Sequence, residues 1–177
     1  MSLRFDRFGT CVCAPPYGSG AWRHRESVVD ADGSLRTTPR RSMPTTTIRC
    51  SCRSVEIQLT GKPMLQYCCH CDDCQAVHGK AYPVSLFAAL AVSVAHGHTD
   101  VFTLRTSPRT KCKRCGTYLF AEVAGYAGVI GDLLPEGMFK PKFHIQCRYA
   151  AVPIQDDLPH YKGTPARFRG SDELVQW

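Results

Sequence analysis

The sequence predicts a mostly β protein, and three observations support this fold class. From Thr45 onward the chain consists of short apolar or alternating runs. Turn residues such as Gly and Pro separate these runs at short intervals. No long amphipathic pattern suggests a helix. Apolar residues make up 44% of the 177 residues, which is enough for one packed core. No apolar run approaches the ~20 residues that a membrane span needs.

The elements follow in order along the chain. Val55, Ile57 and Leu59 alternate with polar neighbours and predict the first clear strand, which a turn at residues 61–63 ends. Residues 64–67 predict another strand, and residues 71–77 a helical turn that ends near Gly79. The remaining predicted strands cover residues 82–87, 91–95, 101–104, 118–123, 128–133 and 143–149.

The chain divides into one domain and two flanking segments. Residues 1–43 are rich in Arg, Ser, Thr, Pro and Gly without any periodicity, and predict a flexible N-terminal extension. Residues 44–165 form the predicted zinc-binding domain. Residues 166–177 form a C-terminal tail or a short helix, with a helical turn expected at residues 171–176, where Ser171 would serve as N-cap.

Eleven cysteines are the outstanding feature of the composition. Their number is odd, the N-terminus lacks the apolar stretch of a secretory signal, and most of them form C-x-C or C-x-x-C pairs. In a reducing compartment such pairs are typical metal ligands. We therefore expect a cytoplasmic metal protein. The pair Cys11 and Cys13 lies in the N-terminal extension, and we interpret it as incidental.

The metal predicted by these thiols is zinc, which favours soft thiolate ligands in a tetrahedral arrangement. The first cysteine cluster is a C-x-C pair at the head of the alternating strand. The second is the run C-C-H-C-D-D-C, and the third is a C-x-x-C-G turn. The candidate ligands in these clusters are Cys50, Cys52, Cys69, Cys71, Cys74, Cys112 and Cys115. In the third cluster, Gly116 tolerates the left-handed backbone that closes such a turn.

Spacing alone leaves two pairings of these clusters open. In one, Cys71 and Cys74 join the 112/115 turn in a four-cysteine ribbon. In the other, the 50/52 pair joins the 112/115 turn, and the three cysteines of the second cluster form a separate site. The second pairing uses more of the cysteines.

The combined motif resembles the family of glutathione-dependent formaldehyde-activating enzymes, whose superfamily includes centromere protein V. The similarity covers roughly residues 46–161 and follows the order C-x-C, C-H-C-x-x-C, S-P-x-x-K-C-x-x-C-G-T, G-D-L and a strand that begins at His144. The resemblance implies the second pairing. It places a structural zinc on Cys50, Cys52, Cys112 and Cys115, and a catalytic zinc on Cys69, Cys71 and Cys74. It also implies a fold of packed, tent-like antiparallel sheets around the zinc knuckles.

Three thiolates leave a fourth zinc position open for a substrate. The resemblance then implies a carbon–sulfur lyase that acts on a thiol–aldehyde adduct, as S-(hydroxymethyl)glutathione synthase does, with glutathione as co-substrate. The three-cysteine site is the weaker one and is expected to be partly occupied. His144 is a candidate for a residue that contacts the ligands of this zinc without binding the metal itself. We expect His70 to face solvent or an anionic ligand, and Asp72 and Asp73 to supply charge at the start of a helix.

A second hypothesis is a zinc-stabilised binding module without catalysis, which recruits protein or nucleic acid. The formal charge of +7 is compatible with nucleic acid. The basic residues are scattered, however, apart from the pairs Arg40-Arg41 and Lys113-Arg114. Nucleic acid and membrane are therefore disfavoured as partners, and a small thiol–aldehyde adduct is preferred.

Overall fold

The fold was analysed in a computed structural model, which describes residues 43–105 and 107–177. The predicted N-terminal extension and the pair Cys11 and Cys13 lie outside the described residues. In the described part of the chain, ten strands and one α-helix follow one another. They are β1 (Thr45–Arg49), β2 (Glu56–Thr60), β3 (Leu65–Cys69), α1 (Asp72–His78), β4 (Tyr82–Ala88), β5 (Val92–His96), β6 (Thr99–Thr103), β7 (Pro108–Cys112), β8 (Tyr118–Val123), β9 (Tyr126–Ile130) and β10 (His144–Ile145).

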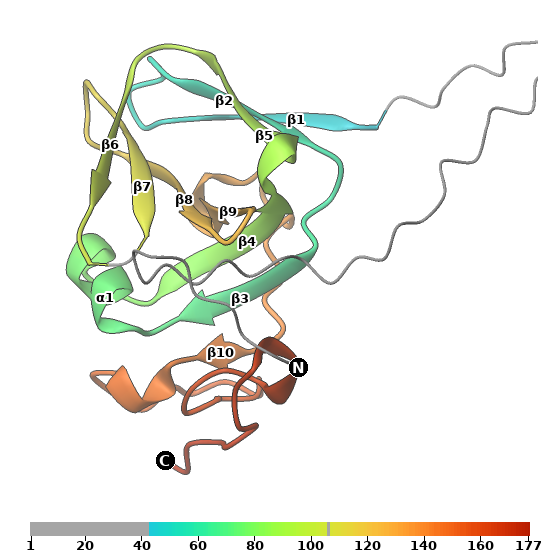
Figure 1. Cartoon of the computed structure of the whole chain (residues 1–177), viewed down its shortest axis with the longest axis vertical. Helices are drawn as coiled ribbons and strands as arrows, with labels where there is room; N and C mark the ends of the chain where they lie inside the picture. Colours follow the sequence, from blue (N-terminus) through green and yellow to red (C-terminus); the bar gives the residue numbers. More distant parts are fainter. Residues whose placement is uncertain (1–42, 106) are drawn as a thin grey trace, which may run out of the picture. The chain divides into compact units, whose positions relative to one another are not determined.

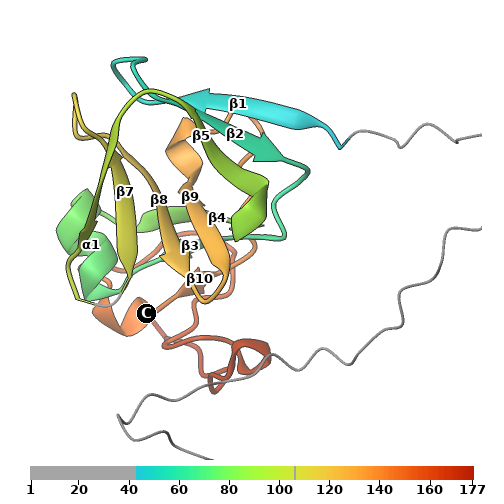
Figure 2. The same cartoon turned by 45° about the horizontal axis from the view of Figure 1, so that its top comes forward.

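The strands form two sheets, which confirms the mostly β prediction (Figures 1 and 2). The smaller sheet has the order β1-β2-β5, and the larger has the order β10-β3-β4-β9-β8-β7-β6. All pairs of strands are antiparallel except β10 and β3, which run parallel. Among the described residues no helix is long and apolar enough to cross a membrane.

The core lies between the two sheets. In β2 the alternation that the sequence displays places Ile57 and Leu59 on the buried face, and both are fully buried. They pack in one cluster with Phe87 of β4, Leu119 of β8 and Val129 of β9. Burying these side chains removes about 1.5–3 kcal/mol of unfavourable hydration for each. The smaller sheet therefore covers one end of the larger sheet and is fixed there by apolar packing.

Three differences from the predicted elements have local causes. The strand predicted at residues 143–149 stops after Ile145, because Gln146 adopts a left-handed backbone with φ of 58° and a 3-10 turn follows. Strand β7 was not predicted, since Pro108–Cys112 carries polar residues. The terminal helical turn lies at Ala166–Phe168 rather than at residues 171–176.

Gly97 brings the turn between β5 and β6 against the loop that carries the first cysteine pair. Its φ is +91°, and a Cβ atom at this position would lie 2.0 Å from the carbonyl oxygen of Ser54. We expect Gly97→Ala to lower the free energy of unfolding by about 3 kcal/mol or more, because backbone atoms cannot move aside cheaply. Urea unfolding of the zinc-loaded protein measures this loss.

Gly79→Ala is the matched control. Gly79 caps α1 with φ of +67°, and no atom would lie within 4 Å of an added Cβ. This variant incurs only the left-handed conformational cost of about 1–2 kcal/mol. Equal losses in the two variants would show that the contact between Gly97 and Ser54 has no role.

Candidate metal centres and their surroundings

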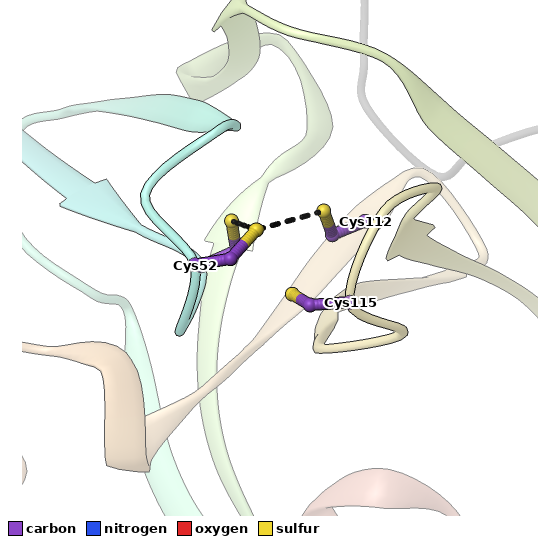
Figure 3. Close-up of side chains that lie close together, drawn as sticks. Cys52, Cys112 and Cys115 are labelled. Carbon is purple, nitrogen blue, oxygen red and sulfur yellow. Dashed lines mark hydrogen bonds between the residues drawn. The ribbon is translucent and has the colours of Figure 1, made fainter.

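The structure brings four of the predicted ligands together between the two sheets. Cys50 and Cys52 follow β1, and Cys112 and Cys115 flank the turn after β7; their four sulfur atoms lie within 4.8 Å of one another. Figure 3 shows Cys52 facing the 112/115 turn. The Sγ atoms are 3.5 Å apart for Cys50 and Cys52, and 3.9 Å apart for Cys52 and Cys112. Tetrahedral zinc with Zn–S bonds of about 2.3 Å separates its sulfurs by about 3.8 Å. This cluster can therefore hold zinc.

Protein groups surround this four-cysteine cluster. The Ser54 hydroxyl lies 3.0 Å from the Cys52 sulfur and 3.3 Å from the Cys112 sulfur. The backbone N–H of Val55 donates to the Cys50 sulfur. A hydrogen bond from the Thr117 hydroxyl lowers the pKa of Cys115 to about 5, so this thiol ionises readily. Cys50 and Cys112 also belong to the main hydrophobic core. The arrangement is typical of a closed, structural metal site.

The second cluster consists of Cys69, at the end of β3, and Cys71 and Cys74, which flank the start of α1. Their sulfur atoms also lie within 4.8 Å of one another. Hydrogen bonds from the Cys69 and Cys74 thiols lower the pKa of Cys71 to about 2, whereas its hydrogen bond to Cys71 raises the pKa of Cys69. The ionisation of each of these three thiols therefore depends on its two neighbours. A divalent cation with thiolate preference would let all three ionise, so the donor set suits zinc.

The three-cysteine cluster borders a cavity of about 140 Å³. Aromatic and aliphatic side chains from β3, β4 and β8 form its walls, including Tyr82, Val84 and Val123. Arg109 of β7 also lines it and is only 5% exposed. Sequence reasoning missed Arg109, because a polar strand such as Pro108–Cys112 gives no signal that its arginine is buried. The number of donors distinguishes the two sites: one cluster has four sulfur atoms, and the other has three sulfur atoms beside a cavity.

The other predicted residues of this region lie on the helix and in the core. Asp72 and Asp73 occupy the first turn of α1, as predicted, and Arg105 lies 3.6 Å and 3.4 Å from their respective carboxylates. Cys147 is buried, and Cys68 is half-buried outside both clusters. The cysteines of the described part of the chain are all free thiols.

The expectation that His70 faces solvent is wrong. Its ring is 7% exposed, and its Nε2 lies 2.9 Å from Nδ1 of His144, which the parallel pairing of β10 with β3 brings alongside. Burial and the neighbouring His144 lower the pKa of His70 to about 4. Nε2 of His144 in turn lies 2.9 Å from an oxygen of Asp156, whose other oxygen lies 2.9 Å from His160. His144 therefore belongs to a buried chain of polar groups that begins next to the three-cysteine cluster.

His78, at the end of α1, makes the fold sensitive to acid. Its ring stacks on Tyr82 with centroids 4.0 Å apart, and burial, with the nearby charge of Arg109, lowers its pKa to about 4 from 6.5. Between pH 6.5 and pH 4 the His78 ring binds a proton in the unfolded chain but not in the folded protein. The free energy of unfolding therefore has its full value above pH 6.5 and falls as the pH approaches 4. Allowing for solvent around the half-buried ring, we expect His78 to account for about 1 kcal/mol of this loss at pH 5.

His78→Phe tests this expectation, because it keeps the aromatic stacking and removes the titration. The difference in melting temperature between pH 7 and pH 5 should be smaller in the variant than in the original protein. Zinc content is measured at both pH values, so that loss of metal is separated from protonation of the ring. An unchanged difference, with zinc retained, would refute the role of His78.

The arrangement defines a class: a small β protein whose free cysteines form one cluster of four and one cluster of three that borders a cavity. A model of the glutathione-dependent formaldehyde-activating enzyme family matches residues 45–149, which is more than half of the chain, so the chain belongs to this family. The family is generally enzymatic. No curated protein matches the chain. Among solved structures, a Rhodobacter sphaeroides protein is 21% identical over 52% of this chain and 89% of that chain, with a TM-score of 0.42.

Proposed function

We propose that this protein is a zinc-dependent carbon–sulfur lyase, which forms or cleaves the bond between a thiol and a small aldehyde. The observation that carries the proposal is the contrast between the two cysteine clusters. The cluster of Cys69, Cys71 and Cys74 offers three donors beside a cavity, whereas the four-cysteine cluster offers a complete set of four zinc ligands. Membership in a formaldehyde-activating family supports glutathione as the thiol.

In this proposal Cys69, Cys71 and Cys74 would hold the catalytic zinc, and Cys50, Cys52, Cys112 and Cys115 the structural one. Zinc at the three-cysteine cluster would supply Lewis acidity that lowers the pKa of a substrate thiol, so that the thiol is present as thiolate near neutral pH. The apolar cavity walls exclude water from the reacting groups. Free thiols throughout the described residues suit a reducing compartment such as the cytoplasm.

The residues behind the three-cysteine cluster keep it oriented. His70 lies between two of the proposed ligands in sequence, and its backbone N–H donates to the carbonyl oxygen of Ile145 in β10. Its side chain points to His144 rather than to the metal cluster. We propose that His144 acts here as a positioning residue, which holds His70 and so the loop between Cys69 and Cys71.

The test is a screen of the zinc-loaded protein with formaldehyde and several thiols, among them glutathione and 2-mercaptoethanol. Exchange NMR measures the rate at which free and adduct forms interconvert. The lyase proposal predicts acceleration with at least one thiol, and loss of that acceleration in Cys71→Ser. If no thiol gives a rate above the uncatalysed one, the proposal is wrong and the non-catalytic zinc module takes its place.

A further inference from the structure

Cys71 lies between two spaces of different character. On one side is the cavity of about 140 Å³ described above, which we call the inner cavity. On the other is a more open groove of about 280 Å³, the outer groove, whose lining includes Cys71, Asp72, Arg105, Gln146, Arg148 and Tyr149. The inner cavity has half the volume of the outer groove and is less open to solvent. We therefore expect the bulk of a tripeptide-sized thiol to lie in the outer groove and a small group to enter the inner cavity.

Arg109 provides the inner cavity with a buried hydrogen-bond donor. Its Nε–H is inaccessible to solvent and has no hydrogen-bond acceptor among the described residues. One terminal nitrogen, Nη2, makes only a loose ion pair of 4.0 Å with Asp73. The protein therefore compensates the guanidinium charge only in part, and a ligand oxygen beside the guanidinium would gain a charge-assisted hydrogen bond. A guanidinium has only donors and no acceptor, which suits it to an oxygen that becomes negative.

The walls of the cavity strengthen any interaction that Arg109 makes. Val84 and Leu86 are apolar, and the hydroxyl of Tyr82 already donates to the carbonyl oxygen of Gly128, whereas Asp73 and the 48% exposed Val123 also belong to the lining. Beside this partly shielded wall, a positive donor stabilises a developing negative charge more than it would in bulk water. The cavity is thus suited to a small group that acquires negative charge on oxygen.

We propose that the inner cavity receives the aldehyde carbon and that the guanidinium group of Arg109, which lines this cavity, donates a hydrogen bond to the aldehyde oxygen. This inference rests on the proposed lyase function and assigns it a further catalytic residue. The thiolate sulfur provides the electron pair for the new S–C bond, and the π pair of the C=O bond moves onto oxygen. Arg109 stabilises the resulting alkoxide and keeps its own proton. The alkoxide takes a proton from water, which balances the proton that the thiol released; cleavage follows the reverse path.

Binding of two glutathione derivatives without a carbonyl group on sulfur to the zinc-loaded protein tests the role of Arg109 without turnover, and mass spectrometry of the recovered protein checks that no cysteine has exchanged with the S-sulfo group. S-sulfoglutathione carries anionic oxygens on the atom bonded to its sulfur, where the alkoxide would form, and S-methylglutathione carries none. Calorimetry gives the ratio of the two affinities. We expect the original protein to favour the sulfo derivative at least tenfold, and Arg109→Met to abolish this preference while its affinity for the methyl derivative stays within twofold.

Arg105→Met is the matched control, because Arg105 also lies beside Asp73 but lines the outer groove. Its loss should leave the affinity ratio unchanged. A ratio that is unchanged in Arg109→Met, or that falls equally in Arg105→Met, overturns the proposal. In turnover, removal of one such donor should lower kcat by about a hundredfold with little change in KM for the thiol.

A second variant covers the case in which Arg109→Met does not fold or does not retain zinc. Gly128→Ala would place a methyl group 3.2 Å from Cγ1 of Val84, which also lines the inner cavity. It should weaken binding of the bulkier sulfo derivative at least threefold more than that of the methyl derivative, and equal effects would refute the inner cavity as the aldehyde site. If no thiol is turned over but Arg109→Met abolishes the preference for the sulfo derivative, the lyase function is wrong and the oxyanion site remains. If the original protein turns over a thiol but the affinity ratio is unchanged in Arg109→Met, only the inference about Arg109 is wrong.

Discussion

Cys112→Ser should unfold the protein, whereas Cys71→Ser should leave it folded with one zinc fewer. Cys112 is fully buried in the main core, and its cluster links the smaller sheet to the larger across about 60 residues of chain. A metal cross-link over such a long loop opposes much chain entropy, and structural zinc contributes about 10–16 kcal/mol to folding in small domains. Cys71 belongs to a cluster confined to residues 69–74, where the chain is already held by β3 and α1.

The expected results are therefore distinct. Cys112→Ser should lower the melting temperature by more than about 15 °C or abolish the cooperative transition. Cys71→Ser should change it by only a few degrees, and should lower the zinc content from two ions per chain to one. Circular dichroism and metal analysis measure both properties. Cys68→Ala, at a half-buried thiol outside both clusters, is the control and should keep both ions. If Cys71→Ser unfolds the chain as severely as Cys112→Ser, the division into structural and catalytic sites is wrong.

Local chemistry made the cysteine pairs and the helix predictable from the sequence, whereas the joining of the 50/52 pair with the 112/115 turn came from the family resemblance. The C-x-x-C turn positions two sulfurs within a few residues, and Gly79 ends α1 because it adopts the left-handed conformation at the cap. The alternation of Ile57 and Leu59 likewise determines which face of β2 is buried. In these cases neighbours in sequence decide the structure, so a single sequence is sufficient.

The surroundings of the three-cysteine cluster were not predictable in the same way. The contact between His70 and His144 depends on a two-residue parallel pairing between segments more than seventy residues apart. Arg109 and Thr110 are adjacent in β7 and both are buried, so β7 has no alternating pattern that reveals the burial of Arg109. Such features follow from tertiary packing, which overrides local propensity.

His70, His144, Asp156 and His160 form a chain of hydrogen bonds. Trp177 determines which group donates and which accepts in each of them. The indole Nε1–H is only a donor, and it donates to Nδ1 of His160 over 2.9 Å. Nε2 of a neutral His160 must then carry the proton and donate to Asp156. The same carboxylate accepts from Nε2–H of His144, so Nδ1 of His144 accepts from His70. Although desolvation opposes it, the hydrogen bond from His160 lowers the pKa of Asp156, and the carboxylate is ionised at neutral pH.

His144, Asp156 and His160 also lie within 4.8 Å of one another, and residues of these types can bind a metal. The direction of the hydrogen bonds decides whether they form a third metal site. A metal on Nε2 of His160 would need the lone pair that the proton occupies, while Nδ1 is already used by Trp177. The group is therefore a hydrogen-bonded cluster, and the protein should bind two zinc ions per chain rather than three.

Asp156→Asn should consequently destabilise the fold without changing its zinc content. The amide oxygen can accept from one histidine, but the amide NH₂ would face the Nε2–H of the other, and Trp177 prevents His160 from changing its tautomer. Loss of one hydrogen bond and of the charge in the other, at a side chain that is 39% exposed, should lower the free energy of unfolding by about 1–3 kcal/mol. Urea unfolding measures the loss, and Asp157→Asn at the exposed neighbouring residue should remain within about 0.5 kcal/mol of the original protein. A zinc ion lost from Asp156→Asn would instead identify the cluster as a third metal site, since a hydrogen-bonded cluster has no metal to release.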